Sequence, residues 1–332
     1  MNKNKAKKIA TWIIVPLMAA IFILDIITVA LSNRYADEFT VNQETFTLEN
    51  GDDRIHFLNT ANSDSILVES NGRFFLVDAG EGNDNPRRKT DYKGYEKEVI
   101  DYIKKVAVVD GEVKLDFILG THCHYDHIGS FEALINDLDI SIGKAYFKQF
   151  NEKVAKDYET ESWKIDATYA AVISSLEARG IEVVSELPDE EFSFGDFTVQ
   201  FYNTVTPQEL YGNGENASSV GVKLTKNGKT AFLAADITES TGLEDLLAEK
   251  IGDIDLLKIG HHGYYGSSSA GFLRILKPEI AVVTNQLGKI YPNVKWNLTM
   301  VAKVPVYATY DNNGVIATFT DESSIVLTNN IH

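Results

Sequence analysis

The sequence predicts an α/β protein: a four-layer αββα sandwich of two face-to-face β-sheets with helices outside, preceded by one membrane-spanning helix. Three observations predict this fold. Short apolar runs typical of strands alternate with helical stretches from residue 54 to the carboxyl terminus. The chain shows no internal repeat and no low-complexity linker, so one folded domain is expected. The amino terminus carries a single long apolar segment.

The first element is the apolar segment at residues 9–31. As a helix its 23 residues are about 35 Å long, enough to cross a hydrocarbon core of roughly 30 Å. Four lysines precede it, and the positive-inside rule therefore places the amino terminus in the cytoplasm and the body outside the cell. A cleaved signal peptide is the alternative, although its apolar core is usually shorter. Asp25 interrupts the segment and is expected near the outer interface or against a partner.

We therefore expect a basic stub and anchor helix at residues 1–33, a polar stalk at 34–50 and a folded domain at 51–332. The chain would be a single-pass protein of the cell membrane with an extracellular domain, or a secreted protein after signal cleavage. Residues 1–34 carry a charge of +4, which leaves −21 for the rest of a chain whose total is −17. A body this acidic disfavours nucleic acid as a partner, or simply keeps the domain soluble.

The elements of the domain follow from its apolar patterns. The amphipathic helix is clearest at residues 94–107, where Val99, Tyr102, Ile103 and Val106 share one face. A polar helical stretch at residues 151–179 is expected to form a surface insertion. Further helices are expected near 239–250 and 270–276, and strands at 54–59, 64–70, 73–80, 115–120, 197–203, 219–225, 229–234, 255–260, 279–285, 305–310, 314–319 and 324–329.

Four potential metal ligands follow the apolar strand at residues 115–120. The segment THCHYDHIGS places His122, His124, Asp126 and His127 within six residues. Imidazole and carboxylate groups are ligands of zinc and similar first-row metals. In extended backbone, His122 and His124 point the same way. The segment therefore predicts a metal site at the end of this strand, with Asp126 and His127 in the following turn beside a second metal ion.

With this segment, the chain resembles the metallo-β-lactamase fold superfamily, whose HxHxDH signature is complete here. The likeness extends over residues 54–328. It implies that Asp78, in FFLVDAGE, orients the metal loop from outside the ligand shell. It also implies that Asp236, in TAFLAADITES, bridges two metal ions. Taken alone, the position of Asp236 before Ile237 favours a helix N-cap.

The segment DLLKIGHHG matches the last ligand motif of the superfamily. We expect His262 to bind the second metal ion and His261 to face the substrate or handle a proton. The resemblance implies two divalent metal ions, zinc or alternatively manganese. It implies catalytic roles for Asp126, Asp236 and His261. The implied metal ligands are His122, His124, Asp126, His127, Asp236 and His262.

One departure from the superfamily pattern concerns a further histidine ligand, because no histidine lies between residues 127 and 261. Asn216 in GENASSVGVKL is the candidate for that place, with Ser219 beside it. This layout resembles the extracellular metallo-hydrolase domain of competence DNA-uptake channel proteins. The bacterial phosphorylcholine esterases, which strip phosphorylcholine from teichoic acids, are still more similar. The chain lacks the aromatic repeats by which those esterases dock on choline.

The resemblance implies a hydrolase whose metal ions activate water, so that no serine or cysteine nucleophile is needed. We expect a phosphodiesterase that acts on a small-molecule or cell-wall phosphodiester such as teichoic-acid phosphorylcholine. Its quaternary ammonium group would need an aromatic cage. Candidates are Tyr264 and Tyr265 after the HHG motif, and Tyr158, Trp163 and Tyr169 in the insertion, although each could simply pack.

Two alternatives stay open. One is a membrane-tethered nuclease like the uptake-channel domain, which the charge of the body disfavours. The other is a non-catalytic binding module on the same fold. A β-lactamase is disfavoured, because enzymes with that activity usually keep the missing histidine.

Overall fold

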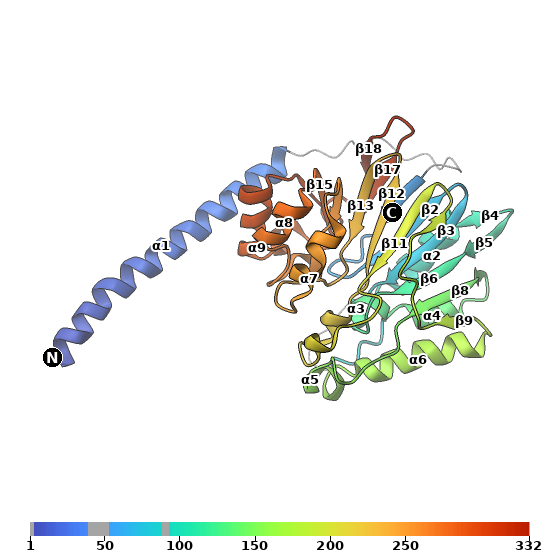
Figure 1. The fold of residues 1–332 in the computed structure, drawn as a ribbon, viewed down its shortest axis with the longest axis horizontal. Coiled ribbons are helices and arrows are strands. Elements are labelled where there is room, and N and C mark those ends of the chain that lie inside the picture. Colours follow the sequence, from blue (N-terminus) through green and yellow to red (C-terminus); the bar gives the residue numbers. More distant parts are fainter. Residues whose placement is uncertain (1–2, 39–52, 88–92, 332) are drawn as a thin grey trace.

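Two β-sheets lie face to face in the computed structural model of the chain, which describes residues 3–38, 53–87 and 93–331 (Figure 1). The larger sheet runs in the order β18 (Ile325–Asn329), β17 (Val315–Phe319), β1 (Asp53–Phe57), β2 (Ser65–Ser70), β3 (Arg73–Ala79), β6 (Phe117–Gly120), β8 (Lys144–Phe147) and β9 (Glu182–Val184). The second sheet runs in the order β10 (Phe192–Phe194), β11 (Phe197–Tyr202), β12 (Gly221–Lys226), β13 (Lys229–Leu233), β14 (Leu256–Lys258), β15 (Ile280–Val283) and β16 (Val306–Ala308).

Helices complete the predicted αββα sandwich. The larger sheet is covered by α2 (Glu96–Val106), α3 (Tyr125–Ile128), α4 (Phe131–Asn136), α5 (Asp157–Glu161) and α6 (Ile165–Ala178). The second sheet is covered by α7 (Leu243–Ile251), α8 (Ala270–Leu276), α9 (Pro292–Trp296) and the π-helix η5 (Asn297–Ala302). Short 3-10 helices lie at η1 (Gln208–Leu210), η2 (Glu215–Ser218), η3 (Gly260–Gly263) and η4 (Leu287–Lys289).

Three apolar clusters hold the four layers together, one between the sheets and one under each helical layer. Strand β3 shows why its sequence is apolar throughout. Phe75 and Val77 point into the cluster between the sheets, and Phe74 and Leu76 point toward the helices. Both faces of a strand in a covered sheet are buried, so alternation with polar residues is lost.

Residues 115–120 differ from the single strand that was predicted. Leu115 ends β5 (Glu112–Leu115), which belongs to a small third sheet with β4 (Val108–Val109) and β7 (Ile140–Ile142). Phe117 begins β6 in the larger sheet. Between them, at Asp116, the chain passes from the third sheet to the larger sheet. The N–H of Asp116 donates to Phe74 O of β3 at 2.7 Å. An apolar run alone does not reveal such a change of sheet.

The predicted surface insertion at residues 151–179 is part of the helical layer instead. It forms α5 and α6, and α6 buries Ile165, Val172 and Leu176 in the cluster beneath the larger sheet. The predicted face of α2, with Val99, Tyr102, Ile103 and Val106, is buried as expected.

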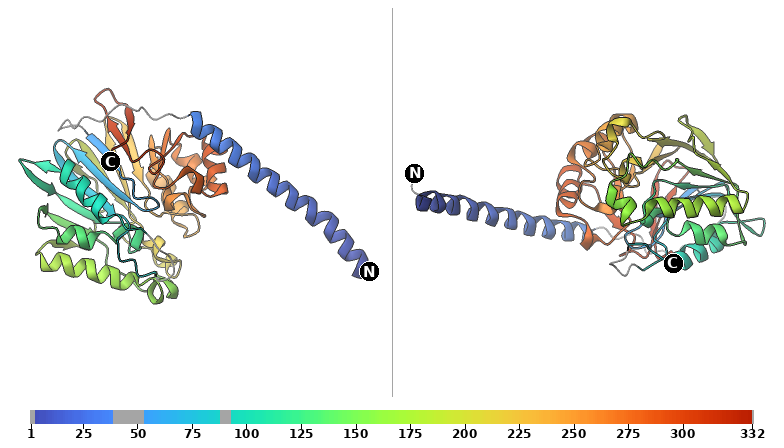
Figure 2. Two further views of the ribbon diagram at one scale, coloured as in Figure 1. Left: turned by 180° about the vertical axis from the view of Figure 1, so that it is seen from behind. Right: turned by 90° about the horizontal axis from the view of Figure 1, so that it is seen from below.

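Helix α1 (Lys3–Glu38) is longer than the anchor expected at residues 1–33. Its segment Thr11–Leu31 is long and apolar enough to cross a membrane. The carboxyl-terminal half of α1 packs against α9 and η5, and the rest stands clear of the body (Figure 2). Residues 39–50 of the expected stalk lie outside the described residues.

Candidate metal centre

The chemistry-bearing side chains gather where parallel strands of both sheets end. Strands β3, β6 and β8 pair in parallel in one sheet, and β13, β14 and β15 do so in the other. Asp78 lies near the end of β3, and the HxHxDH loop follows β6. Asp236 follows β13, and His261 and His262 follow β14. The carboxyl ends of parallel strands are the usual place for ligand sites in open α/β sheets.

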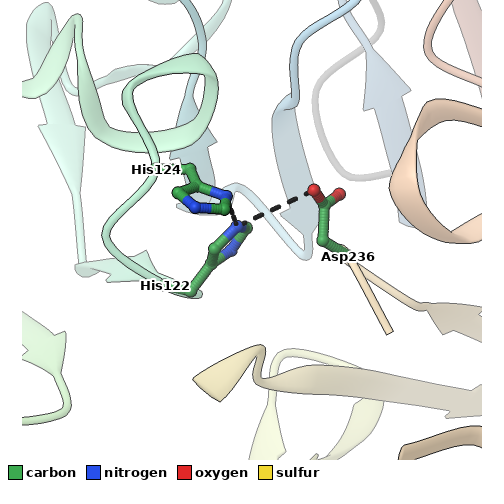
Figure 3. Close-up of side chains that lie close together, drawn as sticks. All are labelled: His122, His124 and Asp236. Carbon is green, nitrogen blue, oxygen red and sulfur yellow. Dashed lines mark hydrogen bonds and ion pairs between the residues drawn. The ribbon is translucent and has the colours of Figure 1, made fainter. Parts of the chain in front are cut away.

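His122, His124 and Asp236 form the first potential metal pocket (Figure 3). His122 Nε2 lies 3.2 Å from His124 Nδ1 and 3.8 Å from Asp236 Oδ2. All three residues are buried. The two histidines come from the loop after β6 in one sheet and Asp236 comes from the other sheet, so the fold itself assembles this pocket.

Asp126, His127 and His262 form the second potential metal pocket. His127 Nε2 and His262 Nε2 lie 3.2 Å apart, and His262 Nε2 lies 3.8 Å from Asp126 Oδ2. Asp236 Oδ1 lies 3.2 Å from His127 Nε2 and 3.4 Å from His262 Nε2. Asp236 therefore presents one oxygen to each pocket.

The two histidines of the HHG motif have different surroundings. The side chain of His262 is fully buried in the second pocket. The side chain of His261 is 29% exposed, and its Nε2 lies 3.8 Å from Asp236 Oδ2, the oxygen that faces His122. The structure thus brings His262 among the potential ligands and leaves His261 at the accessible side of the first pocket.

Outer hydrogen bonds determine which nitrogen of each histidine faces inward. The Thr121 hydroxyl donates to Asp78 Oδ2 at 2.7 Å, so its oxygen accepts from His122 Nδ1 at 3.1 Å. The Thr284 hydroxyl donates to Asp64 Oδ1 at 2.6 Å, and its oxygen accepts from His262 Nδ1 at 3.0 Å. Each of these two histidines is therefore held by a threonine that is itself held by a buried aspartate.

The remaining two histidines bind carboxylates directly. His127 Nδ1 donates to Asp78 Oδ2 at 2.7 Å, and His124 Nε2 donates to Glu159 Oε1 at 3.1 Å. With all four outer nitrogens used as donors, the inward nitrogens of the neutral imidazoles carry lone pairs. Two lone-pair nitrogens only 3.2 Å apart repel each other unless a cation lies between them, which is the usual arrangement of metal-bound histidine.

The charges of the centre also favour a cation. Burial disfavours a charged imidazole and holds the pKa of His122 well below its ordinary value. Burial likewise opposes ionisation of Asp236, but the neighbouring histidines, His127 foremost, hold its pKa well below its ordinary value. At His127 the carboxylates of Asp236 and Asp78 outweigh burial and raise the pKa well above the ordinary value. Positive charge is thus stabilised beside Asp236, where a divalent ion would supply it.

Backbone strain accompanies these strand ends. Asp78, Ala235, His261 and His262 all adopt positive φ angles, between 45° and 55°. Such conformations cost free energy for residues other than glycine and persist where the surrounding structure enforces them. They turn the chain at the ends of β3, β13 and β14, where the residues of both pockets lie.

The segment that contains Asn216 and Ser219 is joined to the metal loop by a backbone hydrogen bond. Asn216 lies in η2, and Val220 N donates to Thr121 O at 3.1 Å. Asn216 Oδ1 and Ser219 Oγ are both buried and have no hydrogen-bond partner among the described residues. Neither residue belongs to the two His–Asp pockets, but unpaired buried oxygens beside the loop are candidates for contacts with a ligand.

Aromatic rings border the centre on two sides. Tyr264 lies 5.7 Å from the His261 ring and 6.1 Å from Tyr291, and Tyr265 also lies 6.1 Å from Tyr291. Tyr265 is 67% exposed. On the other side, Trp163 lies 5.5 Å from the His124 ring.

The other two aromatic candidates of the insertion differ from each other. Tyr158 packs on Trp163 at 4.9 Å and so continues the border beside His124. Tyr169 packs on Phe150 in the apolar cluster beneath the larger sheet, so it is a packing residue.

Sequence reasoning missed several residues that support the centre. Lys258 is fully buried in β14 and pairs with Asp64, and it donates to Ala235 O at 3.0 Å. Despite burial, Lys258 holds the pKa of Asp64 well below its ordinary value. Lys258 lies within an apolar strand sequence, and a buried lysine needs an acidic partner, so the sequence alone could have indicated a buried ion pair. Glu159 and Thr284 gave no such signal.

An αββα sandwich with two facing His–Asp pockets at its strand ends defines a class of proteins that are mostly metal-dependent hydrolases. The family model of the metallo-beta-lactamase superfamily matches residues 58–284, and the chain belongs to this superfamily.

Similar proteins include two curated relatives. The chain is 24% identical over 178 residues to ComE operon protein 3 of Bacillus subtilis, which covers 52% of this chain and 20% of that protein. It is 29% identical over 84 residues to Recombination protein 2 of Haemophilus influenzae, which covers 25% of this chain and 10% of that protein. The chain thus spans a fifth or less of these relatives.

Solved structures of low sequence identity are also similar. The metallo-beta-lactamase fold protein YhfI from Bacillus subtilis is 14% identical with a TM-score of 0.48, over 77% of this chain and 96% of that one. Zn²⁺-bound PqqB from Methylobacterium extorquens is 14% identical with a TM-score of 0.41, over 74% of this chain and 84% of that one.

Proposed function

We propose that the chain is a metal-dependent phosphodiesterase with two divalent ions, zinc in preference to manganese. The observation that carries the proposal is the convergence of imidazole nitrogens on both carboxylate oxygens of Asp236. His122, His124 and Asp236 would hold one ion, and Asp126, His127, His262 and Asp236 the other. When bound, such ions lower the pKa of water and stabilise negative charge on the attacked phosphoryl group.

The residues around the ions would prepare the substrate. A water oxygen would form a bond to phosphorus and give up a proton, while the bond to the leaving alcohol breaks and that alcohol takes up a proton. His261, at the accessible side of the first pocket, is the candidate to hold this proton. The unpaired Ser219 hydroxyl would donate to an oxygen of the phosphodiester, whereas the unpaired Asn216 Oδ1 can only accept a hydrogen bond or bind a cation. Tyr264 and Tyr265 offer ring faces to a quaternary ammonium group such as that of phosphorylcholine.

The apolar segment of α1 supports a membrane location for this activity. We propose that α1 anchors the chain in the cell membrane, with the amino terminus in the cytoplasm and the domain outside. Cell-wall phosphodiesters such as teichoic-acid phosphorylcholine would then lie within its reach. Secretion after cleavage is the alternative, and the length of the full apolar segment favours the anchor.

The test is turnover of p-nitrophenyl-phosphorylcholine by the zinc-loaded full chain in detergent. We expect turnover that depends on zinc and is lost in His124→Ala, while Tyr169→Phe, which alters a packing residue, keeps it. Absence of turnover in a folded, zinc-loaded protein would reject this substrate.

A nuclease is the second candidate, because one of the curated relatives is named Recombination protein 2. The same two-ion chemistry would serve a DNA phosphodiester.

A further inference from the structure

A groove lies between α1 and α9, away from the metal centre. It has a volume of about 570 Å³, and its walls are almost entirely apolar. The α1 wall contains Met18, Ile21, Phe22 and Leu24, all of which are more than half exposed. The opposite wall is made by Pro292, Asn293 and Trp296 of α9.

The α1 wall of this groove belongs to the part of α1 that can cross a membrane. Its lining residues run from Met18 to Thr28, inside the apolar segment Thr11–Leu31. A surface at that depth is solvated by lipid chains and not by water. Apolar groove walls with large exposed side chains fit that solvent, whereas in water they would form an unfavourable exposed patch.

Helices α1 and α9 are in contact, and this brings the charge of Asp25 near Lys295. Asp25 lines the groove, and Lys295 of α9 is 8% exposed. Burial lowers the pKa of Lys295, and the charge of Asp25 opposes that shift. An ionisable residue within a membrane segment usually has such a partner. The acidic residue that interrupts the apolar segment therefore has a lysine of the domain within electrostatic range.

A continuous series of contacts joins the groove to the metal centre. Pro292, in the groove wall, follows Tyr291 directly. The N–H of Tyr291 donates to Gly263 O in the HHG loop at 2.9 Å, and its ring packs on Tyr264, which in turn packs on His261. Figure 1 shows α9 as the part of the body that meets α1.

We propose that an acyl chain of an outer-leaflet lipid fills the groove between α1 and α9. The edge of the metal centre formed by Tyr264 and Tyr265 then lies at the level of the lipid headgroups. The proposal rests on the membrane anchoring proposed above. It specifies the substrate class as a phosphodiester carried at the membrane surface. Tyrosine is suited to that level, because its ring is apolar and its hydroxyl is polar.

The three tryptophans of the chain allow a direct test without any substrate. Trp296 lines the groove, Trp12 lies in the apolar segment, and Trp163 lies beside His124. We would make three variants that each keep one tryptophan and carry phenylalanine at the other two. Each full-length variant is placed in nanodiscs whose lipids carry bromine on the acyl chains, and its fluorescence is compared with that in unbrominated lipid.

We expect bromine to quench Trp12 and Trp296 strongly and Trp163 hardly at all. Adding Asn293→Phe, which places a ring in the groove, should reduce the quenching of Trp296 and leave that of Trp12 unchanged. In a variant without the three native tryptophans, Tyr265→Trp should be quenched by nitroxide on the lipid headgroup.

The outcomes separate this proposal from the anchoring on which it rests. Quenching of Trp12 without quenching of Trp296 would overturn the lipid-filled groove and retain the anchor. If aqueous iodide quenched Trp296 instead, the groove would be open to water. If neither iodide nor bromine quenched Trp296, a protein segment would fill the groove. Quenching of Trp296 by iodide, or its quenching by neither agent, overturns the proposal. Loss of Trp12 quenching would reject the anchor itself. None of these readouts depends on hydrolysis.

Discussion

Glu159 fixes His124 from a helix outside the HxHxDH loop. Its carboxylate accepts from His124 Nε2 and also from Glu215 N at 3.1 and 3.2 Å. Glu159→Gln removes the charge that orients and polarises the imidazole. We therefore expect zinc affinity at the first pocket to fall by roughly 10–100-fold, with the second ion retained.

Zinc titration by calorimetry checks this expectation. Glu161→Gln is the matched control, because Glu161 is exposed on the same helix. Equal zinc affinity in the two variants would show that Glu159 does not position His124.

Asp236 presents an oxygen to each pocket, so its replacement should affect both ions. In Asp236→Asn one oxygen becomes an amide nitrogen that cannot bind a cation, and the shared negative charge is lost. We expect bound zinc to fall from two ions to one or none, and turnover to fall by more than about 100-fold, beyond the usual effect of an outer partner. Elemental analysis of the purified variant gives the ion count. Retention of two ions would exclude the bridging role.

How well the sequence predicts these residues depends on how close they lie in the chain. His122, His124, Asp126 and His127 share one turn, so their spacing is visible without a structure. Glu159 reaches His124 only because α5 folds back over the loop, and nothing local in its sequence marks that contact. Asp64, Lys258 and Thr284 likewise meet only because the two sheets pack against each other.

At the scale of elements, Glu244 links α7 to the start of α8. Its side chain is buried and accepts from Ser269 N at 2.9 Å, while its second oxygen has no hydrogen-bond partner. Burial raises the pKa of Glu244 to about 7 from 4.5. The folded state therefore holds this proton to higher pH than the unfolded chain does. The free energy of unfolding should fall as pH rises from about 4.5 to about 7, and stay lowered above that.

The variant Glu244→Gln should remove this pH dependence. Glutamine keeps an acceptor for Ser269 N and carries no charge at any pH. We expect it to be as stable as the native chain near pH 4.5 and more stable at pH 8, by up to about 3 kcal/mol. Urea unfolding at both pH values measures the difference, with Glu249→Gln on the exposed side of α7 as control. A variant less stable at pH 8 would contradict the assignment.

The predicted elements were those with a clear period or a long apolar run. Strands β1 to β3 and helices α2 and α8 coincide with their predicted ranges to within a few residues. The short strands β7 to β10 were missed, because three or four residues are too few to show a period. Helix α9 and the π-helix η5 were missed as well, because five and six residues are too few to show a helical period.

At the scale of the whole molecule, the alternation of strands and helices predicted the αββα layers, but not the order of strands in each sheet. That order is set by contacts between residues far apart in the chain, such as the pairing of β1 with β17. The metal centre depends on the same long-range order, because its ligands come from both sheets. Metal binding and the packing of the two sheets should therefore be coupled.

Zinc should accordingly stabilise the whole domain. An ion that binds only the folded state adds about 4 kcal/mol to the free energy of unfolding when its concentration is about 1,000 times Kd. For a domain of this size that corresponds to a rise in Tm of roughly 10 °C. Thermal unfolding with and without a chelator measures it, and re-addition of zinc should restore the higher Tm. Asp236→Asn should show a much smaller shift, and an equal shift would place the stabilising zinc elsewhere.

The charge of the whole body distinguishes the two candidate substrates. Residues beyond position 34 carry −21, so DNA would have to bind against strong repulsion. Binding of single strands weakens with salt in proportion to the phosphates contacted, with a slope of roughly −0.7 for each. A choline ester carries one phosphate, so its binding should depend only weakly on the salt concentration. Between about 50 and 200 mM salt, we therefore expect kcat/KM for p-nitrophenyl-phosphorylcholine to change less than about threefold, with no cleavage of single-stranded DNA. Zinc-dependent DNA cleavage that falls steeply with salt and is lost in Asp236→Asn would assign the centre to a nuclease.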